Sequence, residues 1–286
     1  MSSAVPGAGA VGLVLARPLR LLGIEPFFME FIGGIDERLA ERDLSVLLHV
    51  VTTHDDEIAT YRRWAAHHLV DAVTVVNRTD DDHRPAVLQE LGLPAVLVGA
   101  PAEACDLPAV RTDDAGPMRE AVAYLLGLGH RRIARVSGPA NLLHTRARSA
   151  AMREVCAEAV ILEGDYSEEA GAKLTAELLD REDRPTAILY DNDVMAVAGL
   201  AAAAERGVAV PDQLSLIAWD DSTLCRLAVP PLTTMSVDVH QFGRAVAESV
   251  LELVDGGPVA ERWSPIAHLV ERASTAAPAE PVSRES

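Results

Sequence analysis

Short continuous runs of aliphatic residues alternate along the chain with longer amphipathic segments. The first aliphatic run is Val11–Ala16, and the first amphipathic segment is Pro26–Glu41. The later runs, which we predict to be strands, are 44–51, 72–77, 95–99, 132–137, 160–163, 187–190 and 215–219. The other amphipathic segments, which we predict to be helices, are 55–68, 85–91, 116–128, 146–158, 167–180, 193–206 and 241–254.

Strands that are aliphatic throughout are typical of parallel sheets covered by helices on both faces. The number of strand–helix steps exceeds one doubly wound sheet, so the pattern predicts two α/β lobes. Glycine and proline fall between the predicted elements, as at Gly92–Pro94 and Gly127–Gly129, which supports their boundaries.

Ligands of open α/β sheets bind outside the carboxyl ends of the strands. The residues that follow the predicted strands are Arg17, Asn77, Gly99, 137–139, 191–193 and 220–221. Acids, an amide and a nearby arginine suit a neutral polyhydroxylated ligand. Structural explanations stay open at this point: Asp220–Asp221 could form a turn or a helix cap, and Arg148 could be a surface arginine at a helix start. Phe27–Phe28 could be a core contact or could stack on a ligand ring.

Composition and charge argue against DNA binding and membrane insertion by this chain. The chain has 286 residues, 49% hydrophobic and 24% charged, which is the balance of a globular protein. With 43 acidic and 25 basic residues its formal net charge is -18, so we do not expect this chain to bind DNA by itself. It shows no signal-peptide pattern and no apolar stretch long enough to cross a membrane, and its three cysteines are widely spaced. We therefore expect a cytoplasmic protein that makes no membrane contact.

Motifs for catalysis, cofactors and metals are missing. The sequence contains no GxSxG, Walker A, HExxH or CxxC pattern. Gly7–Gly12 matches GxGxxG but precedes its strand, so we interpret it as linker rather than as a dinucleotide loop. His67–His68 and Asp81–His83 have ligand-type side chains without suitable spacing. We therefore expect no enzyme, no cofactor and no metal site.

Several motifs in order resemble one known family. They are Ile188–Ala196, Gly207–Asp212, Leu214–Asp221 and Pro230–Thr234, with further matches at Leu128–Ile133, Ser137–Pro139 and Leu269–Ser274. Together they resemble the effector-binding core of the LacI/GalR family of bacterial transcriptional regulators, over nearly the whole chain. The resemblance implies a periplasmic-binding-protein type I fold: two doubly wound parallel-sheet lobes, joined by three crossovers, with a ligand cleft between them.

The resemblance also implies lobe boundaries. We expect a flexible linker at 1–9, an N-terminal lobe of 10–128 plus 238–263, a C-terminal lobe of 129–237 plus 264–275, and a disordered tail at 276–286. The family's helix-turn-helix headpiece is not among these segments, since the chain starts almost at the first core strand.

We expect six residues at the ligand site: five at positions that the resemblance assigns to ligand binding, and Arg17 because it follows the first predicted strand. They are Arg17, Phe28, His144, Arg148, Asn192 and Asp220. Phe28 would pack on the ligand ring, whereas Arg148 and Asp220 would bond its hydroxyls. Arg17 follows the first strand, and His144 and Asn192 would supply further polar contacts.

The sequence thus predicts the effector-sensing and dimerising core of a LacI-type regulator. Its expected partners are a sugar-like small molecule, a second copy of the chain in a homodimer, and operator DNA contacted only through a headpiece absent from this chain. The alternative is a solute-binding protein of a sugar transporter, which shares the fold but normally has a leader and lacks the Pro230–Thr234 pattern.

Overall fold

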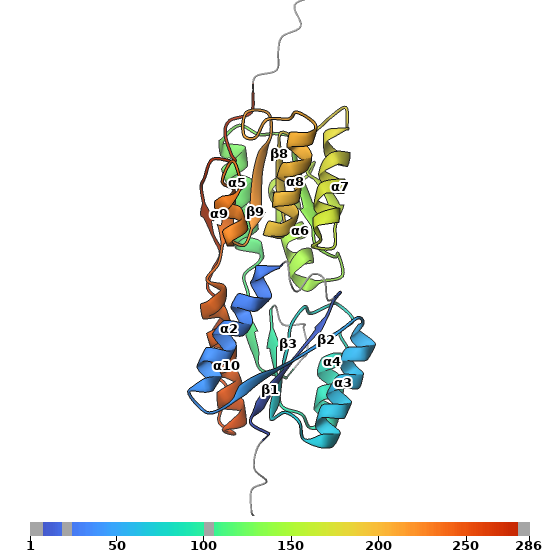
Figure 1. Ribbon diagram of the computed structural model, residues 1–286, viewed down its shortest axis with the longest axis vertical. Coiled ribbons are helices and arrows are strands. Elements are labelled where there is room, and N and C mark those ends of the chain that lie inside the picture. Colours follow the sequence, from blue (N-terminus) through green and yellow to red (C-terminus); the bar gives the residue numbers. More distant parts are fainter. Residues whose placement is uncertain (1–7, 19–24, 100–105, 280–286) are drawn as a thin grey trace, which may run out of the picture. The chain divides into compact units, whose positions relative to one another are not determined.

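The computed structural model describes residues 8–18, 25–99 and 106–279, and these form two compact units (Figure 1). Unit 1 contains the chain up to Asp113, the short segment Leu142–His144, and Asp238–Ile266. Unit 2 contains Asp114–Asn141, Thr145–Val237 and the chain from Ala267 onward. Each unit is therefore assembled from segments that lie far apart in the sequence.

Unit 1 is built around a parallel sheet in the order β11-β5-β4-β3-β1-β2. Its strands are β1 (Ala10–Ala16), β2 (Ser45–Val51), β3 (Ala72–Val75), β4 (Ala95–Val98), β5 (Ala109–Arg111) and β11 (Arg262–Trp263). Helices α2 (Pro26–Ala40) and α10 (Val239–Val254) pack against each other, and α3 (His54–His67) packs beside α4 (Arg84–Leu91) (Figure 1). The apolar core under α3 and α4 includes Trp64, Val73 and Leu97.

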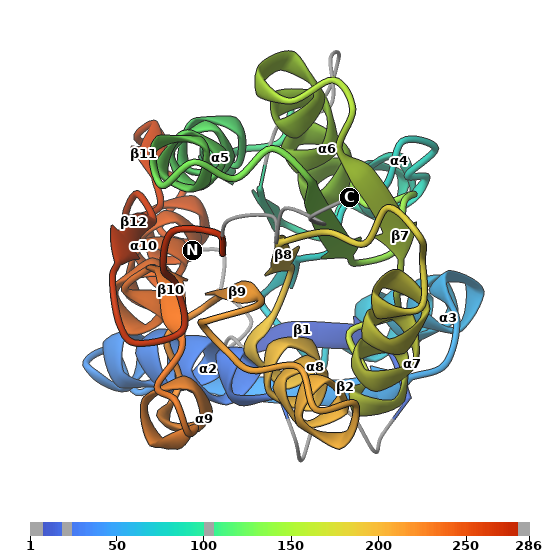
Figure 2. The same cartoon turned by 90° about the horizontal axis from the view of Figure 1, so that it is seen from above.

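Unit 2 has a second six-stranded sheet, ordered β12-β10-β9-β8-β6-β7. Its strands are β6 (Ile133–Ser137), β7 (Val160–Glu163), β8 (Ala187–Tyr190), β9 (Ser215–Trp219), β10 (Thr233–Ser236) and β12 (His268–Val270). Only the β10–β12 pair is antiparallel among these described strands. Helices α5 (Ala115–Gly127) and α6 (Leu143–Val155) lie on one face, with α7 (Glu168–Leu179) and α8 (Asp193–Glu205) on the other (Figure 2). The short helix α9 (Thr223–Leu227) contacts α8.

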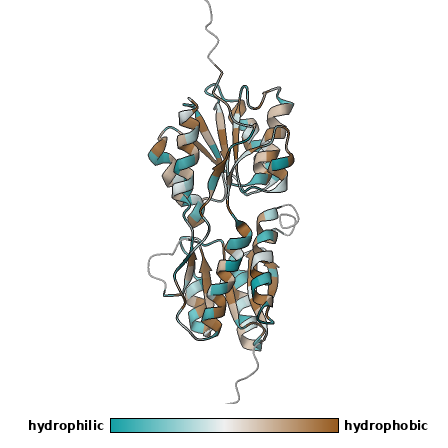
Figure 3. Ribbon diagram, turned by 90° about the vertical axis from the view of Figure 1, so that its left-hand side faces the viewer, coloured by the Kyte–Doolittle hydropathy of each residue, from teal (hydrophilic) through white to brown (hydrophobic). Residues whose placement is uncertain are grey.

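Most residues of the two sheets are hydrophobic, whereas the helices carry both hydrophobic and hydrophilic residues (Figure 3). Strands β3, β4, β6, β8 and β9 are buried along their whole length. This burial explains why these runs are aliphatic rather than alternating. Side-chain caps fix several helix starts, because Thr53, Ser167, Asn192 and Asp238 each accept a backbone N–H of the following turn.

The predicted fold class is confirmed, but one predicted lobe boundary differs from the structure. The first passage between units comes after Asp113, not at residue 128. Helix α5 belongs to unit 2 because Met118, Ala121 and Leu125 pack into the same core as strands β6, β8 and β9. The later passages, at Asp238 and Ala267, lie at or near the predicted positions 238 and 264.

Some residues of the predicted terminal segments are held by hydrogen bonds. Ala8 and Gly9, placed in the linker, donate backbone N–H groups to the Asp71 carboxylate at 2.7 and 2.8 Å. Ala276, placed in the tail, bonds His130 and Ser215. Residues 1–7 and 280–286 lie outside the described residues. Hydrogen-bonding partners distant in sequence therefore hold Ala8, Gly9 and Ala276, which the composition of the segments did not indicate.

Other differences concern short or shifted elements. The predicted helix at 146–158 runs instead from Leu143 to Val155. Strands β5, β10, β11 and β12 and helix α9 were not predicted, because two to five residues carry no clear periodicity. Among the described residues, no helix combines the length and apolar character needed to cross a membrane.

Candidate functional site

The loops after β6, β8 and β9 meet at one edge of the unit 2 sheet, because these strands are parallel neighbours. Asp191, directly after β8, lies at the centre of this edge. It accepts hydrogen bonds from Arg135 Nε at 2.7 Å, Arg135 Nη2 at 2.6 Å and the Gly138 N–H at 2.9 Å. Burial opposes ionisation of Asp191, but Arg135 and these bonds lower its pKa below the ordinary value. The Arg135–Asp191 ion pair therefore fixes the loops at this edge of the sheet.

Arg148 lies in the second turn of α6, near the Arg135–Asp191 pair. Its guanidinium stacks on the Trp219 ring, 3.7 Å from the ring centre, and pairs with Asp114 through Nε at 3.0 Å and Nη2 at 2.8 Å. Burial disfavours the charge of Arg148, but Asp114, with Asp191 and Asp220, raises its pKa. The guanidinium is thus held rigidly, and its Nη1 donates no hydrogen bond within the described part of the chain.

Asp220 follows β9 and adopts a left-handed backbone with φ 69°, which is uncommon outside glycine and asparagine. Its own N–H donates to the Met235 carbonyl at 3.0 Å. Its carboxylate accepts no hydrogen bond from any of the described residues. Burial and the nearby Asp193 raise its pKa to about 8, against the opposing effect of Arg148. The Asp220 carboxyl group can bond a ligand hydroxyl as a donor when it is protonated and as an acceptor when it is ionised.

Asn192 is buried and its amide is already engaged. Its Oδ1 accepts the Met195 N–H at 2.9 Å, capping α8, and its Nδ2 donates to the Tyr166 carbonyl at 3.0 Å. Tyr166 also has a left-handed backbone, with φ 70°, and its buried hydroxyl lies 3.4 Å from Thr145 Oγ1. These contacts favour a role for Asn192 in positioning the loop that carries Tyr166.

The second aspartate of the Asp220–Asp221 pair has a different environment. Asp221 Oδ2 pairs with Arg272 Nη2 at 2.8 Å, and Arg272 also donates to the Leu232 carbonyl at 2.8 Å. This pairing ties the loop after β9 to the chain beyond β12. Asp221 is therefore a structural residue, whereas Asp220 remains available.

In unit 1, two of the predicted site residues lie together after β1. The Arg17 guanidinium carbon lies 4.4 Å from the centre of the Phe28 ring, and Nη1 pairs with the Glu25 carboxylate. All three side chains are buried. Phe28 in turn contacts Phe27 edge to face, at 5.3 Å between ring centres. The sequence left open whether Phe28 is a core residue or a ligand contact, and its burial under Arg17 agrees with both.

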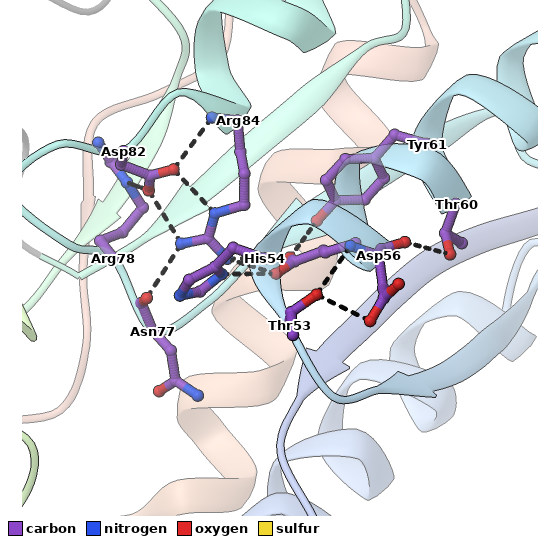
Figure 4. Close-up of polar contacts among 10 residues, drawn as sticks. Thr53, His54, Asp56, Thr60, Tyr61, Asn77, Arg78, Asp82 and Arg84 are labelled. Atoms are coloured by element: carbon purple, nitrogen blue, oxygen red, sulfur yellow. Dashed lines mark hydrogen bonds and ion pairs between the residues drawn. The ribbon is translucent and has the colours of Figure 1, made fainter.

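A buried ion network follows β3 in the same unit (Figure 4). Arg84 Nη1 bonds both oxygens of Glu57 at 2.9 and 3.0 Å, and its Nε and Nη2 bond Asp82 at 2.8 and 2.9 Å. Arg78 Nε donates to Asp82 at 2.7 Å, and Tyr61 donates to Glu57 at 2.5 Å. Two arginines and two carboxylates balance the charge, as burial requires.

The network also fixes the backbone of its loop. Arg84 Nη2 donates to the Asn77 carbonyl at 3.0 Å, and Asn77 has a left-handed φ of 50°. The Asn77 side-chain amide points away from the ions (Figure 4). The Arg78 carbonyl accepts the Leu143 N–H at 2.9 Å, next to a bridge between Thr79 and Leu142. This loop therefore holds the first turn of α6, which contains His144.

The structure thus divides the six predicted residues between the units. Arg17 and Phe28 lie in unit 1 with the segment that contains His144, whereas Arg148, Asn192 and Asp220 gather at the edge of unit 2. Arg148 was predicted to lie at the start of its helix, but it lies in the second turn of α6. Sequence reasoning missed Asp114 and Trp219, the two residues that hold Arg148. The only available signal was that Asp114 precedes a helix and Trp219 ends a strand.

Comparisons with known proteins identify the family to which the chain belongs. A family described as periplasmic binding protein-like domain matches residues 122–275. The HTH-type transcriptional regulator AglR of Rhizobium meliloti is 32% identical over 267 residues, which are 87% of this chain and 73% of AglR. The chain belongs to the LacI family of transcriptional regulators.

Solved structures of LacI-family proteins share the whole fold. A LacI family transcriptional regulator from Bifidobacterium animalis subsp. lactis is 37% identical, with a TM-score of 0.87 over 96% of this chain and 100% of that one. The transcriptional regulator CelR, in complex with cellobiose, is 28% identical, with a TM-score of 0.84 over 94% of this chain and 86% of CelR. The relatives are regulators rather than transporter components or enzymes, which favours the first of the two functions predicted from the sequence.

Proposed function

We propose that this chain is the effector-sensing core of a LacI-type regulator and binds a sugar or related polyol at the carboxyl edges of its sheets. Effector binding would favour one arrangement of the protein and so change its affinity for operator DNA. That coupling requires the effector to bind the two arrangements with different affinity. Consistent with its regulator relatives, the protein would act as a homodimer in the cytoplasm, without catalysis.

One observation carries the proposal: Arg148 is stacked on Trp219 while Asp220 has a carboxylate that accepts no hydrogen bond from the described residues. A rigid guanidinium and an available carboxylate on neighbouring loops give directional bonds to adjacent hydroxyls of one ligand. The Trp219 ring, which is buried in the core of unit 2, fixes the position of that guanidinium. The cellobiose complex of CelR supports a sugar as the ligand class.

Arg17 and Phe28 offer a second set of contacts of the same kind in unit 1. The Phe28 ring is covered by Arg17, so either the pair binds the ligand together or Arg17 moves aside to expose the ring. Asn192 supports the site through Tyr166, because its amide is bonded at both ends.

A thermal-shift screen against neutral sugars tests the proposal. Pentoses, hexoses and disaccharides including cellobiose would be added to the purified chain. A ligand at 100 times its dissociation constant stabilises the native state by about 2.7 kcal/mol. The midpoint should then rise by roughly 5–10 °C. If no sugar or polyol shifts the midpoint, the proposed ligand class is wrong.

Substitutions at the site should remove that shift. Arg148→Ala and Asp220→Ala should each weaken binding of the active sugar at least tenfold, because each deletes a hydrogen-bonding group of the site. Arg181→Ala is a matched control, since Arg181 pairs with the exposed Asp183 among the described residues and lies on the loop after α7. Normal sugar affinity in both site variants would show that the ligand binds elsewhere.

A further inference from the structure

Carboxylates surround Arg148 in the part of the chain that the structure describes. Two nitrogens of its guanidinium are bonded to Asp114, and Asp191 and Asp220 also act on its charge. Arg135, the other buried arginine at this edge, is paired with Asp191, and the side chains of both are fully buried. Each arginine therefore already has a carboxylate partner.

Asp220 adds a carboxyl group with no arginine of its own. No described residue donates a hydrogen bond to it, and Asp193, which is buried at the start of α8, lies close enough to disfavour its ionisation. A ligand at this edge therefore meets a carboxyl group that needs a hydrogen-bonding partner. Among the described residues of this edge, neither Arg135 nor Arg148 is left without a carboxylate.

We propose that Asp114 makes this edge select a neutral ligand rich in hydroxyl groups and reject phosphorylated or carboxylated ones. Asp114 is the specificity-determining residue, because it neutralises the arginine that would otherwise attract an anion. The inference rests on the proposed function, since it assigns the ligand class of that same site.

The geometry explains how the site still binds neutral ligands. Arg148 keeps Nη1 as a donor to a hydroxyl oxygen, while the Asp220 carboxyl group can donate to or accept from the neighbouring hydroxyl. A phosphate at the same place would lose much of its hydration. It would then lie beside the carboxylates Asp114 and Asp191, with an arginine charge that these already neutralise.

Anion binding by charge-reduced variants tests the inference. Inorganic sulfate would be titrated calorimetrically, at low ionic strength, into the wild-type chain and into Asp114→Asn. Asparagine keeps the size of the side chain and an acceptor oxygen for Arg148, but removes the charge. Sulfate should bind Asp114→Asn at least tenfold more tightly than it binds the wild type.

Two further variants locate the effect. Asp183→Asn removes a carboxylate from an exposed ion pair with Arg181 and should leave sulfate affinity unchanged. Arg148→Ala, added to Asp114→Asn, should abolish the gained affinity if Arg148 is the group that holds the anion. Asp114→Ser provides a second neutral variant in case asparagine impairs folding, which circular dichroism would reveal.

The possible results separate the two proposals. Equal sulfate affinity in wild type and Asp114→Asn, or a gain that survives Arg148→Ala, would overturn the charge-selection inference. The sulfate titration needs no sugar. A sugar screen without hits therefore contradicts the proposed function and leaves this result to be judged independently.

Discussion

The Asp220 carboxylate lies where its protonated form is favoured in the folded state. Burial is the main cause, Asp193, Asp191 and Asp114 add to it, and Arg148 opposes it, with the result that the pKa is about 8 against an ordinary 3.8. The folded state therefore holds one more proton than the unfolded state between these two values. The stability that this proton brings is fully present below about pH 4 and is lost as the pH rises through 8.

Asp220→Asn should therefore gain stability relative to the wild type as the pH rises. The difference in melting temperature between the ligand-free proteins should increase from pH 5 to pH 8 and level off by pH 9, because asparagine does not titrate. Each kcal/mol corresponds to roughly 2–4 °C for chains of this size. Asp183→Asn is the control, since the pKa of the exposed Asp183 is lowered by Arg181 and does not enter this range. A difference independent of pH would show that Asp220 is ionised throughout.

At the scale of elements, uninterrupted burial made most of the fold predictable. Strands such as β3 and β8 are aliphatic because both of their faces are covered, and the helices between them keep a clear period. The contacts that build the site were harder to predict because they join distant elements. Arg148 meets Asp114 from 34 residues away, and Arg135, hidden in an aliphatic strand, meets Asp191 from 56 residues away. Residue type alone does not identify such partners.

The packing of α2 on α10 shows a second long-range dependence. Gly33 and Gly34 are neighbours in α2, but a Cβ on Gly34 would collide with the His240 carbonyl of α10, whereas a Cβ on Gly33 would meet nothing within 4 Å. The two helices therefore approach closely along one face of α2 only.

Alanine substitutions at these two glycines should have opposite effects. Gly33→Ala should stabilise the protein by about 0.5–1 kcal/mol, because glycine is a poor helix former. Gly34→Ala should destabilise it by about 1–3 kcal/mol, because α10 must shift. Urea unfolding of both variants measures the difference, and each serves as the control for the other. Equal effects would mean that α2 and α10 are not packed as closely as described.

At the scale of the whole molecule, each unit is completed by the last part of the chain. Helix α10 and strand β11 return to unit 1 after unit 2 has begun, and β12 then pairs with β10 of unit 2. Residues of α10 such as Phe242, Val246 and Val250 are buried, and Phe31 of α2 contacts Phe242 at 5.2 Å between ring centres. Neither unit is therefore a continuous stretch of sequence.

A chain ending at Val237 should fail to fold in either unit. Unit 1 would lose α10, exposing the apolar face of α2, and unit 2 would lose β12 together with the Arg272–Asp221 pair. Trp64 and Trp219 are buried in units 1 and 2 respectively, so their fluorescence during urea unfolding reports on both. The truncated chain should show red-shifted emission and no cooperative transition, whereas the full chain unfolds cooperatively. A cooperative transition with buried Trp219 emission would show instead that unit 2 is stable without β12, so that only unit 1 depends on the returning segment.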